Sequence, residues 1–166
     1  MRSVRRKLVF RARMGIQGFS HVGVCCSDLD RSTRFYTEVL GFRELFTMAM
    51  GDEVARTMER ESIRFESRML VRDDVRLELL HWLEPQAEGD RTRRPMTQFG
   101  MTHLCFRVED VDDLADLAEQ HGGTVHRHTL SELPGAGVGG ATVKLMYLTD
   151  PDGVRIECMA GTPDLG

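Results

Sequence analysis

Apolar residues recur along this chain with two periods: every second residue in short stretches, and every third or fourth residue in two longer ones. The first period predicts strands and the second predicts helices. The expected strands cover 19–26, 42–48, 68–72, 75–83, 102–108, 124–128, 142–149 and 153–159, and the expected helices cover 29–40 and 111–120. The order of one strand, one helix and three strands therefore occurs twice.

Capping and turn residues mark the limits of these elements. Asp28 and Asp110 stand where each helix begins and have the short polar side chain that an N-cap needs. Gly41 and the pair 122–123 stand where the helices end. The acidic pair 73–74 predicts the turn of a hairpin. Both helices are therefore expected to have defined ends.

Two pairs of segments repeat in the same order along the chain. The segment 21–30 resembles 103–112, with a histidine followed by aspartates seven and nine residues later, at an offset of 82 residues. The segment 74–78 resembles 153–157 at an offset of 79. Repetition of both pairs indicates two copies of one unit. We therefore expect an α+β fold with two βαβββ modules in tandem.

Composition divides the chain further. The expected parts are a basic disordered tail at 1–16, a first module at 17–84, a linker at 85–99, a second module at 100–160 and a tail at 161–166. The linker is polar and contains two prolines. Two stretches interrupt the modules: 51–66, with a short helix expected over 53–59, and the glycine-rich 134–140.

Four side chains lie on the strand faces opposite the apolar residues, namely His21, Glu78, His103 and Glu157. Two buried glutamates would be costly without compensation, which a divalent cation supplies. Two neutral imidazoles complete a mixed nitrogen and oxygen set that suits zinc, nickel, cobalt, iron or manganese. If the modules curve their sheets towards a common cleft, these four residues form one metal site.

Charge and cysteine content limit the class of protein. The 166 residues include 22 basic and 26 acidic ones, a net charge of −4, which gives no reason to expect nucleic-acid binding. No apolar stretch is long enough to span a membrane or to serve as a secretory signal. The four cysteines show no metal-binding spacing and are expected to be reduced and mostly buried, as in a cytoplasmic protein: Cys25, Cys26, Cys105 and Cys158.

These motifs resemble those of the vicinal oxygen chelate superfamily, which contains glyoxalases, bleomycin resistance proteins and extradiol dioxygenases. The matching segments include His-Val-Gly-Val at 21–24, Asp-Leu-Asp at 28–30 and Asp-Pro-Asp-Gly-Val-Arg-Ile-Glu at 150–157, and the resemblance covers about 17–160. It implies paired modules that form a cupped mixed sheet around one divalent metal ion per site. It also implies the metal-ligand role for His21, Glu78, His103 and Glu157.

The glutamate at the second ligand position resembles glyoxalase I most closely. The resemblance then implies a lyase or isomerase similar to lactoylglutathione lyase, which transfers a proton next to a carbonyl through a metal-stabilised enediolate. Glu157 is the expected base and Glu78 the alternative. It also implies a small-molecule substrate, a thiol cosubstrate and a homodimer, with each site held either within one chain or across two.

Other functions and other residues remain open from the sequence. The alternatives are an acyl-CoA epimerase such as methylmalonyl-CoA epimerase, a non-catalytic small-molecule binding or resistance protein, and an iron dioxygenase. Arg91, Arg93 and Arg94 fit either a solvated loop or a clamp for an anionic substrate tail. His126 and His128 fit a satisfied surface pair better than a second metal site.

Overall fold

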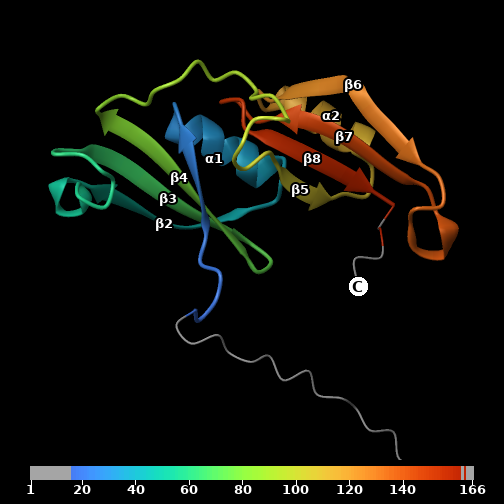
Figure 1. The fold of residues 1–166 in the computed structure, drawn as a ribbon, viewed down its shortest axis with the longest axis horizontal. Coiled ribbons are helices and arrows are strands. Elements are labelled where there is room, and N and C mark those ends of the chain that lie inside the picture. The colour runs from blue at the N-terminus through green and yellow to red at the C-terminus, as the bar shows by residue number, and fades with distance from the viewer. Residues whose placement is uncertain (1–15, 162, 164–166) are drawn as a thin grey trace, which may run out of the picture.

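Two four-stranded mixed sheets lie side by side in the protein (Figure 1). This computed structural model describes residues 16–161 and 163, so nearly all of the predicted basic tail lies outside the described residues. No helix in the described part is long and apolar enough to cross a membrane.

The first module has the predicted βαβββ order. Its elements are β1 (Val22–Cys26), α1 (Leu29–Glu38), β2 (Arg43–Met50), β3 (Arg64–Arg72) and β4 (Val75–Glu84). The strand order is β1-β4-β3-β2, in which β1 runs parallel to β4 and the other neighbours are antiparallel. Asp28 caps α1 by accepting the Arg31 N–H at 2.9 Å, as predicted.

The second module repeats this arrangement. Its elements are β5 (Leu104–Arg107), α2 (Val111–Gln120), β6 (Thr124–Leu133), β7 (Val143–Thr149) and β8 (Arg155–Ala160), in the order β5-β8-β7-β6. Asp110 caps α2 by accepting two backbone N–H groups. The predicted α+β fold with two βαβββ modules is therefore confirmed.

Three elements differ most from the predictions, while others, such as β5 and β8, shift at their ends by one or two residues. The strand predicted at 124–128 continues to Leu133, and the register of β6 shifts between His126 and Ser131. The helix predicted at 53–59 is instead a single 3₁₀ turn, Asp52–Val54. Asp52 Oδ1 accepts the N–H of Ile63 at 2.8 Å, which draws the chain back into β3 after that turn. As a result β3 begins at Arg64, within the stretch predicted as an insertion.

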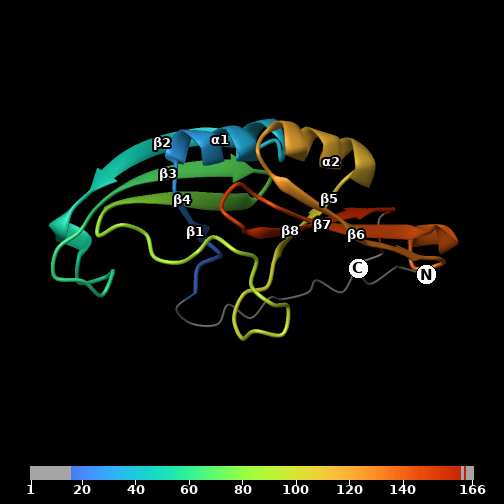
Figure 2. The same cartoon turned by 90° about the horizontal axis from the view of Figure 1, so that it is seen from above.

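Both helices cover the same side of the sheets, and the linker crosses the other side (Figure 2). The helix-facing residues of both sheets form one continuous apolar core. Leu77 and Leu79 in β4 are 1% and 0% exposed, and Ile156 and Cys158 in β8 are fully buried. The predicted alternation is thus confirmed. The opposite face of the first sheet carries Glu78 beside a second apolar cluster that includes Phe65, Leu80 and Trp82.

A tight turn between β7 and β8 joins the modules. Asp152 accepts hydrogen bonds from Ser27 and Arg31 of the first module, with Oδ distances of 2.6–3.0 Å. Asp150 accepts the hydroxyl of the buried Tyr36 at 3.0 Å. These contacts attach the β7–β8 turn to α1 at its beginning, through Arg31, and near its end, through Tyr36.

Candidate functional site

Each sheet carries one close pair of a histidine and a glutamate on the face away from the helices. His21 Nε2 lies 3.2 Å from Glu78 Oε2 in the first sheet. His103 Nε2 lies 3.1 Å from Glu157 Oε2 in the second. The parallel pairing of β1 with β4 and of β5 with β8 brings the two members of each pair together. All four residues predicted as ligands therefore occur in equivalent pairs.

A hydroxyl group next to each histidine holds the imidazole in place. Ser20 Oγ lies 2.9 Å from His21 Nδ1, and Thr102 Oγ1 lies 2.9 Å from His103 Nδ1. A contact at Nδ1 fixes the ring and leaves Nε2 for a ligand bond, as is usual for histidines that bind metals. The sequence analysis missed these hydroxyls, although Ser20 and Thr102 share the offset of 82 residues.

The two glutamates differ in what binds their second oxygen. Ser67 Oγ donates to Glu78 Oε1 at 2.5 Å, and Tyr147 OH donates to Glu157 Oε1 at 3.3 Å. Burial and the nearby Glu157 charge raise the pKa of Tyr147, so its phenol stays protonated. Partial burial and the nearby Glu157 carboxylate raise the pKa of Cys105 to about 12, so this thiol is neutral. The protonated Tyr147 hydroxyl is therefore the side-chain donor that holds the second oxygen of Glu157.

The two pairs stay separate within one chain. Among the described residues, no three His, Cys, Asp or Glu side chains are grouped so that they could hold a metal ion. Each pair nevertheless fits half of a metal site, because an imidazole nitrogen and a carboxylate oxygen already lie side by side. The side chains of Glu78 and Glu157 are only 17% and 13% exposed. One chain thus presents two half-sets of donors.

The expectation of mostly buried cysteines is wrong for half of them. All four thiols are free, and Cys26 and Cys158 are buried in the core. Cys25 and Cys105 are exposed instead. Each lies on the face of its sheet that is opposite the helices, and this face is open.

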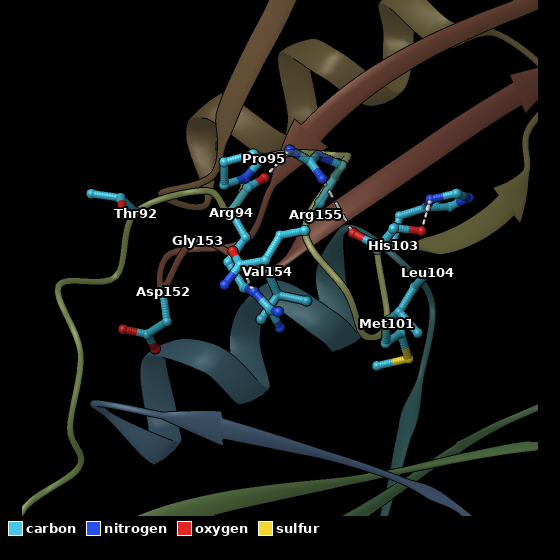
Figure 3. A pocket seen from close by; sticks show the side chains of 12 residues that line it. Thr92, Arg94, Pro95, Met101, His103, Leu104, Asp152, Gly153, Val154 and Arg155 are labelled. Atoms are coloured by element: carbon cyan, nitrogen blue, oxygen red, sulfur yellow. Dashed lines mark hydrogen bonds between the residues drawn. The ribbon is translucent and has the colours of Figure 1, made fainter.

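The linker and the second module form a pocket beside His103. The pocket has a volume of about 240 Å³, and His103, Arg94 and Arg155 are among its lining residues (Figure 3). Arg94 is exposed and donates to Gln98 and to the Phe99 carbonyl oxygen within the linker, as a solvated loop residue does.

The pair of His126 and His128 is not the satisfied surface pair that was expected. The rings lie 6.0 Å apart, and His126 Nε2 is buried without a hydrogen-bond partner. Sequence spacing alone did not indicate this, because it does not reveal the pairing of His126 with Tyr147 in β7.

Comparison with known proteins gives a consistent family. The family described as the Glyoxalase/Bleomycin resistance protein/Dioxygenase superfamily matches residues 18–158. A lactoylglutathione lyase from Haemophilus influenzae is 30% identical over 142 residues, which cover 82% of this chain and 87% of the relative. A 2-epi-5-epi-valiolone epimerase from Actinomyces sp. is 28% identical over 160 residues, which cover 90% and 84%.

A solved structure supports the fold. A glyoxalase family protein from Bacillus cereus superimposes with a TM-score of 0.76 at 21% identity, covering 91% of this chain and 98% of that one. At this identity the match establishes the fold, and the activity has to be argued from the site.

Proposed function

Because the chain belongs to the Glyoxalase/Bleomycin resistance protein/Dioxygenase superfamily, we propose that it is a metal-dependent lyase or isomerase of the glyoxalase type. The reaction is a proton transfer at a carbon next to a carbonyl group. The observation that carries this proposal is the pair of equivalent His–Glu contacts, at 3.2 and 3.1 Å. Relatives named as a lyase and as an epimerase support the reaction class.

The residues proposed to hold the metal are His21, Glu78, His103 and Glu157. A divalent ion bound there would act as a Lewis acid towards the substrate oxygens. Since one chain presents two half-sets on separate sheets, a second copy of the chain completes each site. The His21–Glu78 pair of one subunit then faces the His103–Glu157 pair of its partner, and a symmetric dimer contains two such sites.

Glu157 is the proposed base. Its Oε1 accepts a 3.3 Å hydrogen bond from Tyr147, whereas Glu78 accepts a shorter one, 2.5 Å, from Ser67. A more weakly held carboxylate is freer to leave its place, accept the substrate proton and return it. The Tyr147 hydroxyl orients Glu157 before the transfer through this single long hydrogen bond.

An acyl-CoA epimerase is the second candidate. The same proton removal, followed by return of the proton to the opposite face, would invert a carbon next to a thioester carbonyl. The relative named as a 2-epi-5-epi-valiolone epimerase supports epimerisation as a reaction class, and the acyl-CoA substrate is part of the proposal. Assays with a methylglyoxal–thiol adduct and with a 2-substituted acyl-CoA distinguish the two candidates.

Metal analysis of two double variants tests the site. One variant is His21→Ala with Glu78→Ala, and the other is His103→Ala with Glu157→Ala. We expect about one zinc, nickel, cobalt or manganese ion per wild-type chain and none in either variant, because each loses half of the donors. Elemental analysis of chelator-free, untagged protein measures this. No metal in the wild type after soaking with each ion would refute the proposal.

Mixing the two variants tests whether sites lie across subunits. Unfolding and refolding them together in equal amounts makes about half of the dimers mixed, and each mixed dimer has one intact site. Metal content and activity should therefore return to about a quarter of the wild-type level. Sites held within one chain would give no recovery, and wild-type protein refolded alone is the control.

A further inference from the structure

The side chain of Arg155 is buried beside the proposed base and lacks a carboxylate partner. It lies two residues before Glu157 in β8, hence on the same face. Its exposed fraction is 7%, and no carboxylate of residues 16–161 pairs with it. Its terminal nitrogens donate to the carbonyl oxygens of Arg94 and Thr102, and Nε has no partner. A buried guanidinium without neutralisation favours a site for negative charge.

More cationic groups surround Arg155. A groove of about 360 Å³ is lined by Arg93, Arg94, Tyr147 and Arg155, among others. The guanidinium carbon of Arg155 lies 5.8 Å from the Tyr147 ring centre, and Tyr147 contacts Glu157. The pocket drawn in Figure 3 connects Arg155 with His103 on its other side. The groove therefore adjoins the His103–Glu157 pair.

His126 adds a further unused donor. It pairs across the sheet with Tyr147, and its Nε2 is buried without a partner. Burial, with the charges of Arg93, His128 and Arg155, lowers the pKa of His126. Arg93 and Arg155 therefore lie close enough to His126 to disfavour its protonation.

The first module provides an internal comparison. Arg76 occupies the position equivalent to Arg155, at the offset of 79 residues, and it is exposed. The difference arises because the linker passes over the second sheet and supplies the carbonyl oxygen of Arg94 to Arg155. The linker thus buries Arg155, whereas the equivalent Arg76 stays exposed. Of the two glutamates proposed as ligands, only Glu157 therefore has a buried arginine on the same strand face.

We propose that Arg93 and Arg155 form a subsite for an oxyanion, a carboxylate or a phosphate group carried by the substrate. Arginine donors match the planar or tetrahedral oxygens of such groups. The substrate is then an anion whose charged group lies near the reacting carbon. This link to the reaction rests on the proposed function, whereas binding of the anion by the groove does not.

The test is calorimetric titration with inorganic phosphate and with propionate, at constant ionic strength, on metal-loaded and on chelator-treated protein. We expect saturable binding of at least one anion in both forms. Arg155→Gln should weaken it about tenfold, and Arg93→Gln at least threefold, because each removes a charged donor. Arg127→Gln is the matched control, since Arg127 pairs with Asp116 on the exposed surface of the same module.

Arg93→Gln keeps the test valid if Arg155→Gln disturbs the linker. Binding of phosphate alone assigns a phosphate group to the substrate, and binding of propionate alone assigns a carboxylate. Binding that survives in a metal-free protein supports the subsite even if the metal site fails. Three results would overturn the proposed subsite. The first is the absence of saturable anion binding, and the second is equal weakening of binding by Arg127→Gln. The third is binding that needs metal and is unaffected by Arg93→Gln.

Discussion

The two glutamates of the site occupy equivalent positions, but different hydroxyl donors hold them. The serine hydroxyl lies 2.5 Å from Glu78 and the tyrosine hydroxyl lies 3.3 Å from Glu157. A repeated module therefore need not give two equivalent carboxylates. At this scale, the proposed function assigns the base to Glu157, the glutamate with the longer hydrogen bond, and a purely metal-binding role to Glu78.

Exchange of each glutamate for glutamine tests this difference. Glutamine retains a carbonyl oxygen for the metal but cannot accept the proton, so Glu157→Gln should lower kcat by about 10²–10⁴-fold. Glu78→Gln should lower it by about tenfold or less. Steady-state kinetics with metal content measured in each variant checks the prediction. The reverse order of the two effects, with metal retained, would assign the base to Glu78.

The sequence predicts the four paired residues but not their neighbours. Alternation and the repeat place His21, Glu78, His103 and Glu157 on the polar strand faces, and burial agrees with this. Tyr147 could not be found in this way, because its contact depends on which residue of β7 faces Glu157. Register between strands is set by the whole sheet, which local patterns do not reveal.

Among the elements, α2 was predicted to the residue and β6 was not. Asp110 and the two glycines after α2 define it by local chemistry, and it runs from Val111 to Gln120. By contrast, β6 extends through polar residues to Leu133. These residues form a strand because they pair with β7, and their own polar pattern does not predict one. Ends set by local hydrogen bonds can be predicted, whereas ends set by a partner strand cannot.

Gly123 shows a packing role at the end of α2 that the repeat did not indicate. A Cβ atom there would lie 2.7 Å from the Phe35 ring and 2.9 Å from the Thr149 carbonyl oxygen. Gly123→Ala should therefore lower the free energy of unfolding by about 1–3 kcal/mol through overpacking. Urea denaturation measures this, with Gly18→Ala as the control because that position is open. Equal stability of Gly123→Ala and wild type would contradict the close packing of α2 against α1.

At the scale of the whole molecule, the sequence predicts two modules but not how they join. The junction depends on Asp152, whose side chain is 4% exposed and accepts hydrogen bonds from Ser27, Arg31 and Ser32. These residues are more than a hundred positions away in the chain. Their approach could not be predicted from spacing, and it leaves the two His–Glu pairs on separate sheets.

Asp152→Asn tests this junction. Burial tends to raise the pKa of Asp152, but hydrogen bonds from Ser27 and Arg31 outweigh it, so the pKa is lowered from its usual 3.8. A lowered folded-state pKa gives stability that is present above pH 3.8 and is lost as the pH falls through the folded value. The variant should be about 2 kcal/mol less stable at pH 7, and the difference should shrink at acid pH.

Urea denaturation at pH 7 and at pH 3 measures both effects. Asp73→Asn is the control, because its side chain is 87% exposed at the β3–β4 turn. A stability difference that stays the same at both pH values would show that the charge of Asp152 does not hold the modules together.

The β7–β8 turn also limits how such a chain can change in length. Gly153 lies so close to the backbone of Arg91 that a Cβ atom would not fit, while its neighbour Asp152 binds the start of α1. A residue inserted in this turn would therefore disturb its contacts with α1 and with the linker at the same time. The tip at 134–140 has open space around Gly135, Gly139 and Gly140. Insertions and deletions during divergence should therefore accumulate at that tip and spare the turn.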